Sequence, residues 1–191
     1  MGYWGLFIIV MLAGVVIQST LQGKFAKYSK VSLKYGYTGA DIARKMMQDN
    51  GITDVKVECI EGTLTDHYNP STKTVNLSKK VYYGSSVAAA AVAAHECGHV
   101  VQHAVGYAPL KLRSALVPVV SFANNTVQWI LLLGMLMIRT FPTLLWIGIV
   151  LFAMTTLFSF VTLPVEINAS ARAVNWLENA GITDYETRPM A

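Results

Sequence analysis

Two histidines and a glutamate near the middle of the chain have the spacing of a zinc site. His95, Glu96 and His99 form the pattern H-E-x-x-H, and the alanine-rich run 88–94 leads into them on what reads as one helix. Residues four apart on a helix project from the same face, so we expect the two imidazoles to hold one Zn²⁺. The glutamate between them lies where it can take a proton from a metal-bound water.

A zinc site that keeps one position open for water needs a third protein ligand. His103 continues the histidine series, but residues eight apart on a straight helix are about 12 Å apart along its axis. That separation is too large for His103 to share an ion with His95, so we expect His103 at a surface or interface. The other candidate is Glu166, the first charged residue after a long apolar segment. Spacing alone leaves Glu166 open between a zinc ligand and an ordinary acidic residue at a membrane surface.

Three uncharged segments account for an apolar content of 53% and a charged content of only 14%. They cover residues 3–22, 114–138 and 143–163, and each is long enough to cross a hydrocarbon core of about 30 Å as a helix. The first has no basic residues ahead of its apolar part, unlike a signal peptide, so we expect an uncleaved anchor. The second is interrupted by Pro118 and by polar residues, which we expect to face protein or water rather than lipid.

The distribution of Lys and Arg predicts the orientation of these segments. Of the 15 basic residues, only Arg139 falls between the second and third segments, and the others lie on the opposite side of the predicted membrane. The positive-inside rule assigns that side to the cytoplasm. Two cysteines, Cys59 and Cys97, do not make a disulfide framework, which agrees with a reducing compartment. We therefore expect a multi-pass protein of the cell membrane whose metal site faces the cytoplasm.

Short periodic patterns fill the region between the first two apolar segments. Thr38 and Asp41 have the spacing of a capping box that opens a helix over 42–50. Ser85 or Ser86 can cap the helix that carries the histidines, and Gly106 can end it. Three strands are predicted, at residues 55–60, 63–68 and 74–78, with turn residues 69–72 joining the last two.

These patterns predict an α+β membrane protein that is mainly helical. It would have about three transmembrane helices and a small cytoplasmic zincin-like metalloprotease domain with a short β-sheet. Beyond the third apolar segment, Pro164 suits the start of a helix that continues over 168–176. We expect four parts, which are an anchor over 3–22, the zincin-like domain over 23–113, a transmembrane helical hairpin over 114–163, and a cytoplasmic helix with a polar tail over 164–191.

Several motifs resemble the YugP-type neutral zinc metallopeptidases of membranes, and the similarity covers nearly the whole chain. The motifs are AAHECGHVVQ at 93–102, LPVEINAS at 163–170, LTDHY at 64–68, the stretch 69–78, and YSKV at 28–31. More distantly, H-E-x-x-H followed by a glutamate after a transmembrane hairpin resembles the HtpX and CAAX-prenyl proteases, which are gluzincins. In those proteases the later glutamate is the third zinc ligand, so the resemblance implies that Glu166 completes the site. Family members often continue with a further hydrophobic segment, whereas this chain ends after a polar tail, so a shortened chain is an open alternative.

The resemblance implies zinc-dependent hydrolysis of peptide bonds. Glu96 would accept the proton of the attacking water and pass it to the leaving amine. Stabilising the tetrahedral oxyanion needs a further donor, for which His67 and Tyr68 are the candidates. His67 is equally well read as an ordinary histidine of a hairpin. An edge of that hairpin could bind an extended substrate by strand addition.

Two other classes of function remain as alternatives. One is a non-catalytic zinc-binding membrane scaffold, although the motif keeps both histidines and its glutamate. The other is a metal transporter, which is disfavoured because the motif lies outside the apolar segments and those segments carry no charge. The expected partners are the lipid bilayer and a peptide or protein substrate, with membrane proteins among the candidates. No basic stripe interleaved with aromatic residues indicates a nucleic-acid partner, and the oligomeric state cannot be read from the residues.

Overall fold

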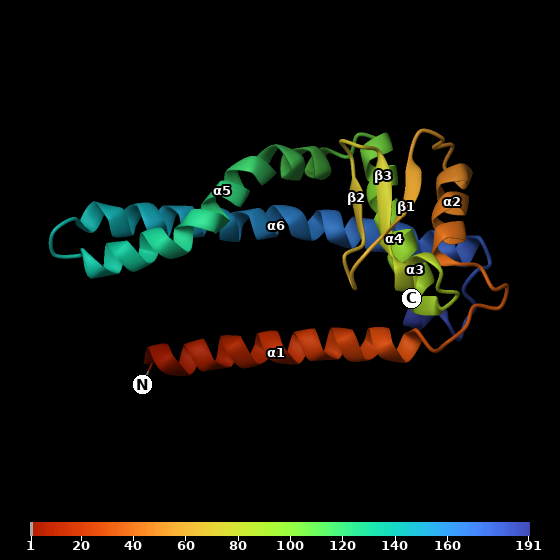
Figure 1. Ribbon diagram of the computed structural model, residues 1–191, viewed down its shortest axis with the longest axis horizontal. Coiled ribbons are helices and arrows are strands. Elements are labelled where there is room, and N and C mark those ends of the chain that lie inside the picture. Colours follow the sequence, from red (N-terminus) through yellow and green to blue (C-terminus); the bar gives the residue numbers. More distant parts are fainter. Residues whose placement is uncertain (1) are drawn as a thin grey trace. The chain divides into compact units, whose positions relative to one another are not determined.

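A computed structural model of the protein describes residues 2–191, with side chains at residue 5 and from residue 8 onward. The described chain is mainly helical and carries one small sheet (Figure 1). The helices are α1 Gly2–Tyr28, α2 Gly39–Asp49, α3 Lys79–Tyr82, α4 Val87–Ala104, α5 Ala108–Leu136 and α6 Pro142–Asn179, followed by a 3-10 turn at Arg188–Met190. The strands are β1 Lys56–Ile60, β2 His67–Asn69 and β3 Thr74–Ser78. The predicted combination of long helices with a short sheet is confirmed.

Two compact units make up the chain. One contains the chain up to Val100 together with Arg172–Ala191, and the other contains Val101–Ala171. The boundaries fall inside α4 and inside α6, so both helices are continuous from one unit into the other. The expected division into an anchor, a zincin-like domain, a hairpin and a C-terminal helix stays a prediction.

Three helices are long and apolar enough to cross a membrane. They are Ile8–Tyr28 within α1, all of α5 and all of α6. In their most apolar stretches the share of buried residues is 0%, 11% and 6%, so these helices present apolar side chains outward. This outward exposure suits contact with lipid rather than with water. The start of the expected anchor, at residues 3, 4, 6 and 7, lies outside the described side chains.

The prediction that a helix starts at Pro164 is wrong. α6 runs without a break from Pro142 to Asn179, with Pro164 inside it. A proline removes one backbone hydrogen bond, but a helix can continue past it where packing holds both sides. Beyond the proline, a stripe of fully or nearly fully buried residues recurs every four positions, at Val165, Ala169, Ala173 and Leu177. This stripe stabilises the helix past the point where the proline weakens it.

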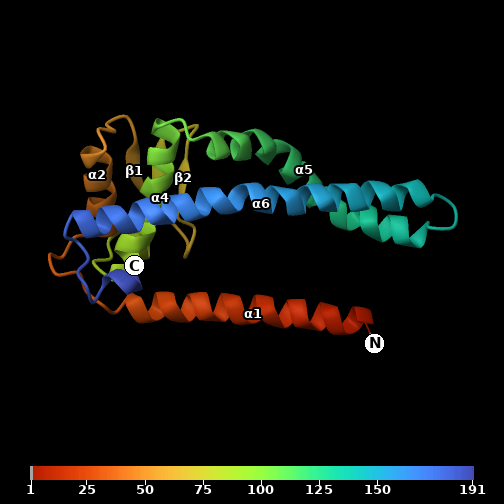
Figure 2. The ribbon, with the colours of Figure 1, turned by 180° about the vertical axis from the view of Figure 1, so that it is seen from behind.

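α5 and α6 run alongside each other (Figure 1, Figure 2). Glycines allow the two helices to approach closely. A Cβ added at Gly134 would lie 2.7 Å from the Cα of Leu145, and one added at Gly148 would lie 2.7 Å from Cδ2 of Leu131. Small residues of this kind are typical of helix contacts within membranes. Pro118 lies inside α5 and accounts for the bend of that helix in Figure 2.

The sheet has the strand order β1-β3-β2, so β3 is central and β2 forms one edge. β1 pairs with β3 in parallel, and β2 pairs with β3 in the antiparallel direction. All of β3 is buried, and its residues Val75 and Leu77 have no exposed surface. The strands predicted over 55–60 and 74–78 are confirmed to within one residue.

The strand predicted over 63–68 is mostly wrong, because only His67–Asn69 pairs with β3. Gly62 and Leu64 have positive φ angles of 115° and 58°. A left-handed residue bends the chain and cannot continue an extended strand. The turn after the strand agrees with expectation, since Oδ1 of Asn69 accepts hydrogen bonds from the backbone N–H of Ser71 and Thr72.

The capping box at the start of α2 is confirmed. Oγ1 of Thr38 accepts from the backbone N–H of Asp41 at 3.2 Å, and the backbone N–H of Thr38 donates to Oδ2 of Asp41 at 3.1 Å. The Thr38 hydroxyl also donates to Oδ2 of Asp41 at 2.6 Å, and this bond, followed by the one from the Thr38 backbone N–H, holds the pKa of the Asp41 carboxyl below its ordinary value. The buried face of α2, which includes Ile42 and Met46, packs on β1 and β3. The core between α2 and the sheet therefore supports β1 and β3.

The close approach of α5 and α6 predicts a large effect of one added methyl group. Because the Cβ of a Gly134→Ala variant would meet backbone atoms of Leu145, the helices must shift, at a cost of about 1–3 kcal/mol in the free energy of unfolding. Gly14 in α1 is the matched control, because nothing lies within 4 Å of a Cβ added there. Thermal unfolding in detergent measures both variants. Equal stability of the two would contradict the close approach.

Candidate metal centre

α4 presents one face to the protein core and a different face to the candidate site. Cys97 has no exposed surface, and its thiol donates to the backbone carbonyl of Ala43 in α2, with Sγ and O separated by 3.5 Å. Burial raises the pKa of this thiol, so it stays protonated. Cys97 lies midway between His95 and His99 in sequence, and at about 100° per residue it points opposite to both of them. The contact with α2 therefore sets the rotation of α4 that turns the two histidines away from α2.

The two histidines lie one turn apart on α4. Their ring centroids are 4.9 Å apart, and the ring planes are nearly perpendicular, at 86°. His99 is buried, with 8% of its surface exposed, and His95 is half-buried. Two imidazoles one helical turn apart can bind a single ion, as the sequence pattern requires.

Glu96 is buried and held from the edge of the sheet. Its Oε2 accepts a hydrogen bond from the backbone N–H of Tyr68 in β2 at 3.1 Å. Burial raises the pKa of the Glu96 carboxyl, while the nearby His95 and His99 and the Tyr68 hydrogen bond act in the opposite direction. A carboxylate with a raised pKa takes up a proton more readily, as a general base must.

The two candidate oxyanion donors, His67 and Tyr68, lie next to each other on β2, where successive side chains point to opposite faces. His67 is exposed, and its Nδ1 lies 2.8 Å from the carbonyl oxygen of Thr65. A carbonyl only accepts, so Nδ1 carries the hydrogen, and Nε2 accepts from the side-chain amide of Asn76 at 3.2 Å. Both ring nitrogens of His67 therefore have partners, one in the segment before β2 and one in β3. Tyr68 contacts Glu96 through its backbone N–H.

Glu166 lies on α6, two residues after Pro164. Its Oε1 is 3.0 Å from Nη1 of Arg113, which lies near the start of α5. Both side chains are about one-third exposed. Pairing with a guanidinium helps to fix the orientation of this carboxylate.

Gln102 anchors α6 on both sides of Glu166. The Gln102 side chain is fully buried, and its amide donates to the carbonyl of Val165 at 2.8 Å and to Oδ1 of Asn168 at 3.0 Å. It lies three residues after His99, on the same face of α4 as the two histidines. The i, i+4, i+7 spacing of His95, His99 and Gln102 on one face of α4 is a sequence signal that could have singled out Gln102.

Among the described residues, His95, His99 and Glu166 form a group that could hold a metal ion. One ligand atom from each of them lies within 4.8 Å of the others. Zinc binds imidazole nitrogen and carboxylate oxygen at about 2.0–2.2 Å, so atoms this close together are within reach of one ion. His103 is exposed and does not belong to the group. The donor set of two imidazoles and one carboxylate fits zinc.

Comparisons with known proteins give the same chemistry. Residues 3–191 match the family described as "Putative neutral zinc metallopeptidase". The chain is 43% identical over 180 residues to a Bacillus subtilis (strain 168) protein described as "Putative membrane protease YugP". That similarity covers 92% of this chain and 79% of the relative. No solved structure matches the chain. The family match covers nearly the whole chain, and the relative is 43% identical. The protein therefore belongs to this family of membrane-associated neutral zinc metallopeptidases.

Proposed function

We propose that the protein is a membrane-bound zinc peptidase in which His95, His99 and Glu166 hold the ion and Glu96 is the general base. The observation that carries the proposal is the convergence of three ligand atoms within 4.8 Å from residues far apart in sequence. Membership of the zinc metallopeptidase family supports the choice of metal and of reaction. The name of the Bacillus subtilis relative supports action at a membrane.

Zinc in such a site supplies a water of lowered pKa and a Lewis acid for the scissile carbonyl. The Glu96 carboxylate has its Oε2 fixed by the Tyr68 N–H, which leaves Oε1 to accept the proton of the attacking water. The same carboxyl then donates that proton to the leaving amine. Because Glu96 is buried and held by a backbone group, it needs little rearrangement to do either.

The edge of β2 supports an extended peptide as substrate. β2 has β3 on one side only, and the Tyr68 N–H that reaches Glu96 points away from β3. A peptide aligned along this edge would place its scissile bond beside Glu96. The substrate is thus a peptide or protein with an accessible extended segment, and membrane proteins remain candidates. The concentration of basic residues on one side of the three apolar helices supports a cytoplasmic catalytic face.

Gln102 and Arg113 act as positioning residues for the third ligand. Gln102 holds the backbone and side chain on either side of Glu166, and Arg113 holds one oxygen of its carboxylate. Hydrogen-bond partners of this kind fix the orientation of metal ligands, and their loss lowers metal affinity. The peptidase would therefore depend on residues that touch neither the substrate nor the ion.

Replacing Glu96 by Gln removes the proton acceptor while keeping the size of the side chain. We expect Glu96→Gln to lower the rate of casein cleavage in detergent by about 10²–10⁴-fold, with zinc still bound. Glu186→Gln, at an exposed carboxylate outside the site, is the control and should cleave at the wild-type rate. Unchanged cleavage by a folded, zinc-loaded Glu96→Gln protein would contradict the role of Glu96. Zinc binding without cleavage by the wild-type protein would instead favour a non-catalytic scaffold.

Replacing Gln102 by Leu removes both hydrogen bonds to α6 at similar volume. We expect Gln102→Leu to weaken zinc binding by about 10–100-fold, measured by competition with a chelator. Gln48→Leu, at an exposed position of α2, is the control and should bind zinc as the wild type does. Thermal unfolding of the metal-free proteins separates loss of fold from loss of the site. Wild-type zinc affinity in Gln102→Leu would rule out the positioning role.

A further inference from the structure

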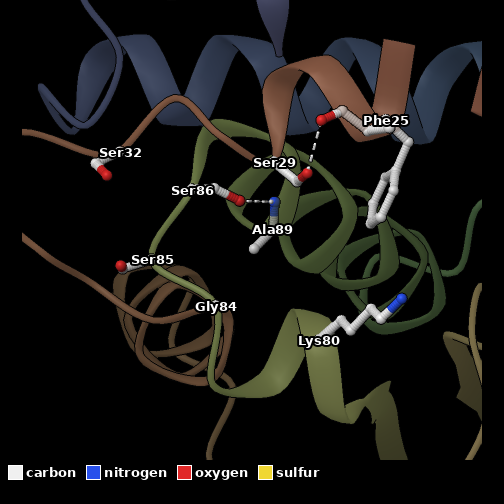
Figure 3. A pocket seen from close by; sticks show the side chains of 9 residues that line it. Phe25, Ser29, Ser32, Lys80, Gly84, Ser85, Ser86 and Ala89 are labelled. Carbon is white, nitrogen blue, oxygen red and sulfur yellow. Dashed lines mark hydrogen bonds between the residues drawn. The ribbon is translucent and has the colours of Figure 1, made fainter. Parts of the chain in front are cut away.

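A cavity of about 420 Å³ lies where α1 ends, and none of the residues that line it belongs to the candidate metal centre. Its lining comes from the last turn of α1, the segment after it, α3 and the start of α4 (Figure 3). The lining side chains used below are Phe25, Ser29, Ser32, Lys80, Ser85 and Ser86. The lining therefore combines apolar surface, including one aromatic ring, with four hydroxyl groups and one cation.

Backbone hydrogen bonds fix the walls of this cavity. The N–H of Leu33 donates to the carbonyl of Ser85 at 2.8 Å, and the N–H of Val87 donates to the carbonyl of Val31 at 2.9 Å. Ser32 and Ser86 form a β-bridge between these bonds. The end of α1 is thus tied to the start of α4, and the cavity between them is built into the fold.

Lys80 gives the cavity a positive charge that no neighbouring carboxylate neutralises. None of the lining residues is acidic, and within the described chain Lys80 has no ion-pair partner. By contrast, the adjacent Lys79 pairs with Glu61, with Nζ and Oε1 separated by 2.5 Å. Figure 3 shows the Lys80 side chain extended in the direction of Phe25. An anion in the cavity would meet an ammonium group that is not already paired.

Hydroxyl groups add hydrogen-bonding capacity. Ser29 donates to the carbonyl of Ala26 at 3.0 Å, and Ser86 accepts from the N–H of Ala89 at 3.2 Å, as drawn in Figure 3. The hydroxyls of Ser32 and Ser85 have no hydrogen-bond partner within the described part of the chain. Figure 3 shows Ser32 and Ser85 on the opposite side of the view from the Lys80 ammonium, so these hydroxyls can bind glycerol oxygens while Lys80 binds a phosphate.

The position of the cavity along α1 places it at the depth of lipid headgroups. The uncharged part of α1 ends at Gln22, and Phe25 follows three residues later, a rise of about 4.5 Å along the helix. The headgroup layer on each side of a bilayer is roughly 5–8 Å thick. Lys24 and Lys27 lie near the end of α1 and Lys30 follows it, so this segment carries positive charge that attracts an anionic membrane surface.

We propose that this cavity binds the phosphate-bearing headgroup of an anionic membrane lipid. Lys80 pairs with the phosphate, Ser32 and Ser85 bind glycerol oxygens of the headgroup, and Phe25 packs against the apolar start of the acyl chains. The proposal does not depend on the peptidase activity, because none of these residues belongs to the metal centre.

The test uses the full chain in detergent and titrates it with short-chain phosphatidylglycerol, short-chain phosphatidylcholine or inorganic phosphate. Binding is followed by native mass spectrometry and by the shift of the unfolding temperature. We expect phosphatidylglycerol to bind and stabilise the wild type more than the other two. Lys80→Gln should weaken phosphatidylglycerol binding about fivefold or more. Lys79→Gln makes the same change of charge one residue away and should leave binding within twofold, and Lys80→Arg should preserve it.

Two results would overturn the proposal. Equal weakening by Lys80→Gln and Lys79→Gln would show that general surface charge, rather than the cavity, attracts the lipid. Equal stabilisation by inorganic phosphate and by phosphatidylglycerol would show a site for free phosphate instead of a lipid site. Lys80 is exposed, so the variant should fold, and its unfolding temperature without lipid checks this.

Discussion

The rotation of α4 about its own axis is the constraint on which the rest of the candidate site depends. Ala90, Ala93, Cys97 and Val100 have at most 1% of their surface exposed and form one buried stripe along the helix. Because that stripe must face the core, His95, His99 and Gln102 must all face the other way. The thiol of Cys97 adds a directional contact to the carbonyl of Ala43, and burial keeps that thiol protonated. Rotating α4 by one residue would expose part of this stripe and break the Cys97 contact, so packing and this contact together select the face that carries the chemistry.

The third ligand poses a different physical problem, because Glu166 lies 67 positions after His99 in the chain. Local helix geometry cannot position it, so the intervening hairpin must. Glycines at the contact of α5 and α6 set how closely those helices pack. Gln102 holds α6 on either side of Glu166, and Arg113 pairs with the carboxylate itself. The buried stripe that starts at Val165 keeps α6 helical past Pro164, which preserves the direction of Glu166. A membrane hairpin thereby becomes part of the proposed catalytic machinery.

Features set by local chemistry could be predicted from the residues, whereas features set by distant packing could not. The capping box at Thr38, the central strand over 74–78 and the three apolar helices follow from short-range patterns, and all are confirmed. The strand before His67 was overestimated because alternation says nothing of the left-handed turn at Leu64. The roles of Gln102 and of the Tyr68 backbone went unnoticed, since a hydrogen bond to a residue 63 or 28 positions away leaves no local pattern. The break expected at Pro164 did not occur, because buried contacts outweighed a local propensity.

The central claim is that Glu166 shares one zinc ion with the two histidines of α4. The most direct measurement is the zinc content per chain of the purified protein beside that of a Glu166→Ala variant. Glu178→Ala is a matched control, because Glu178 also lies on α6 and also pairs with an arginine, Arg188, at 2.8 Å. The account predicts about one zinc per chain in the wild type and in Glu178→Ala, and clear loss of zinc in a folded Glu166→Ala protein. Full retention of zinc by Glu166→Ala would contradict the account and place the third ligand elsewhere in the chain.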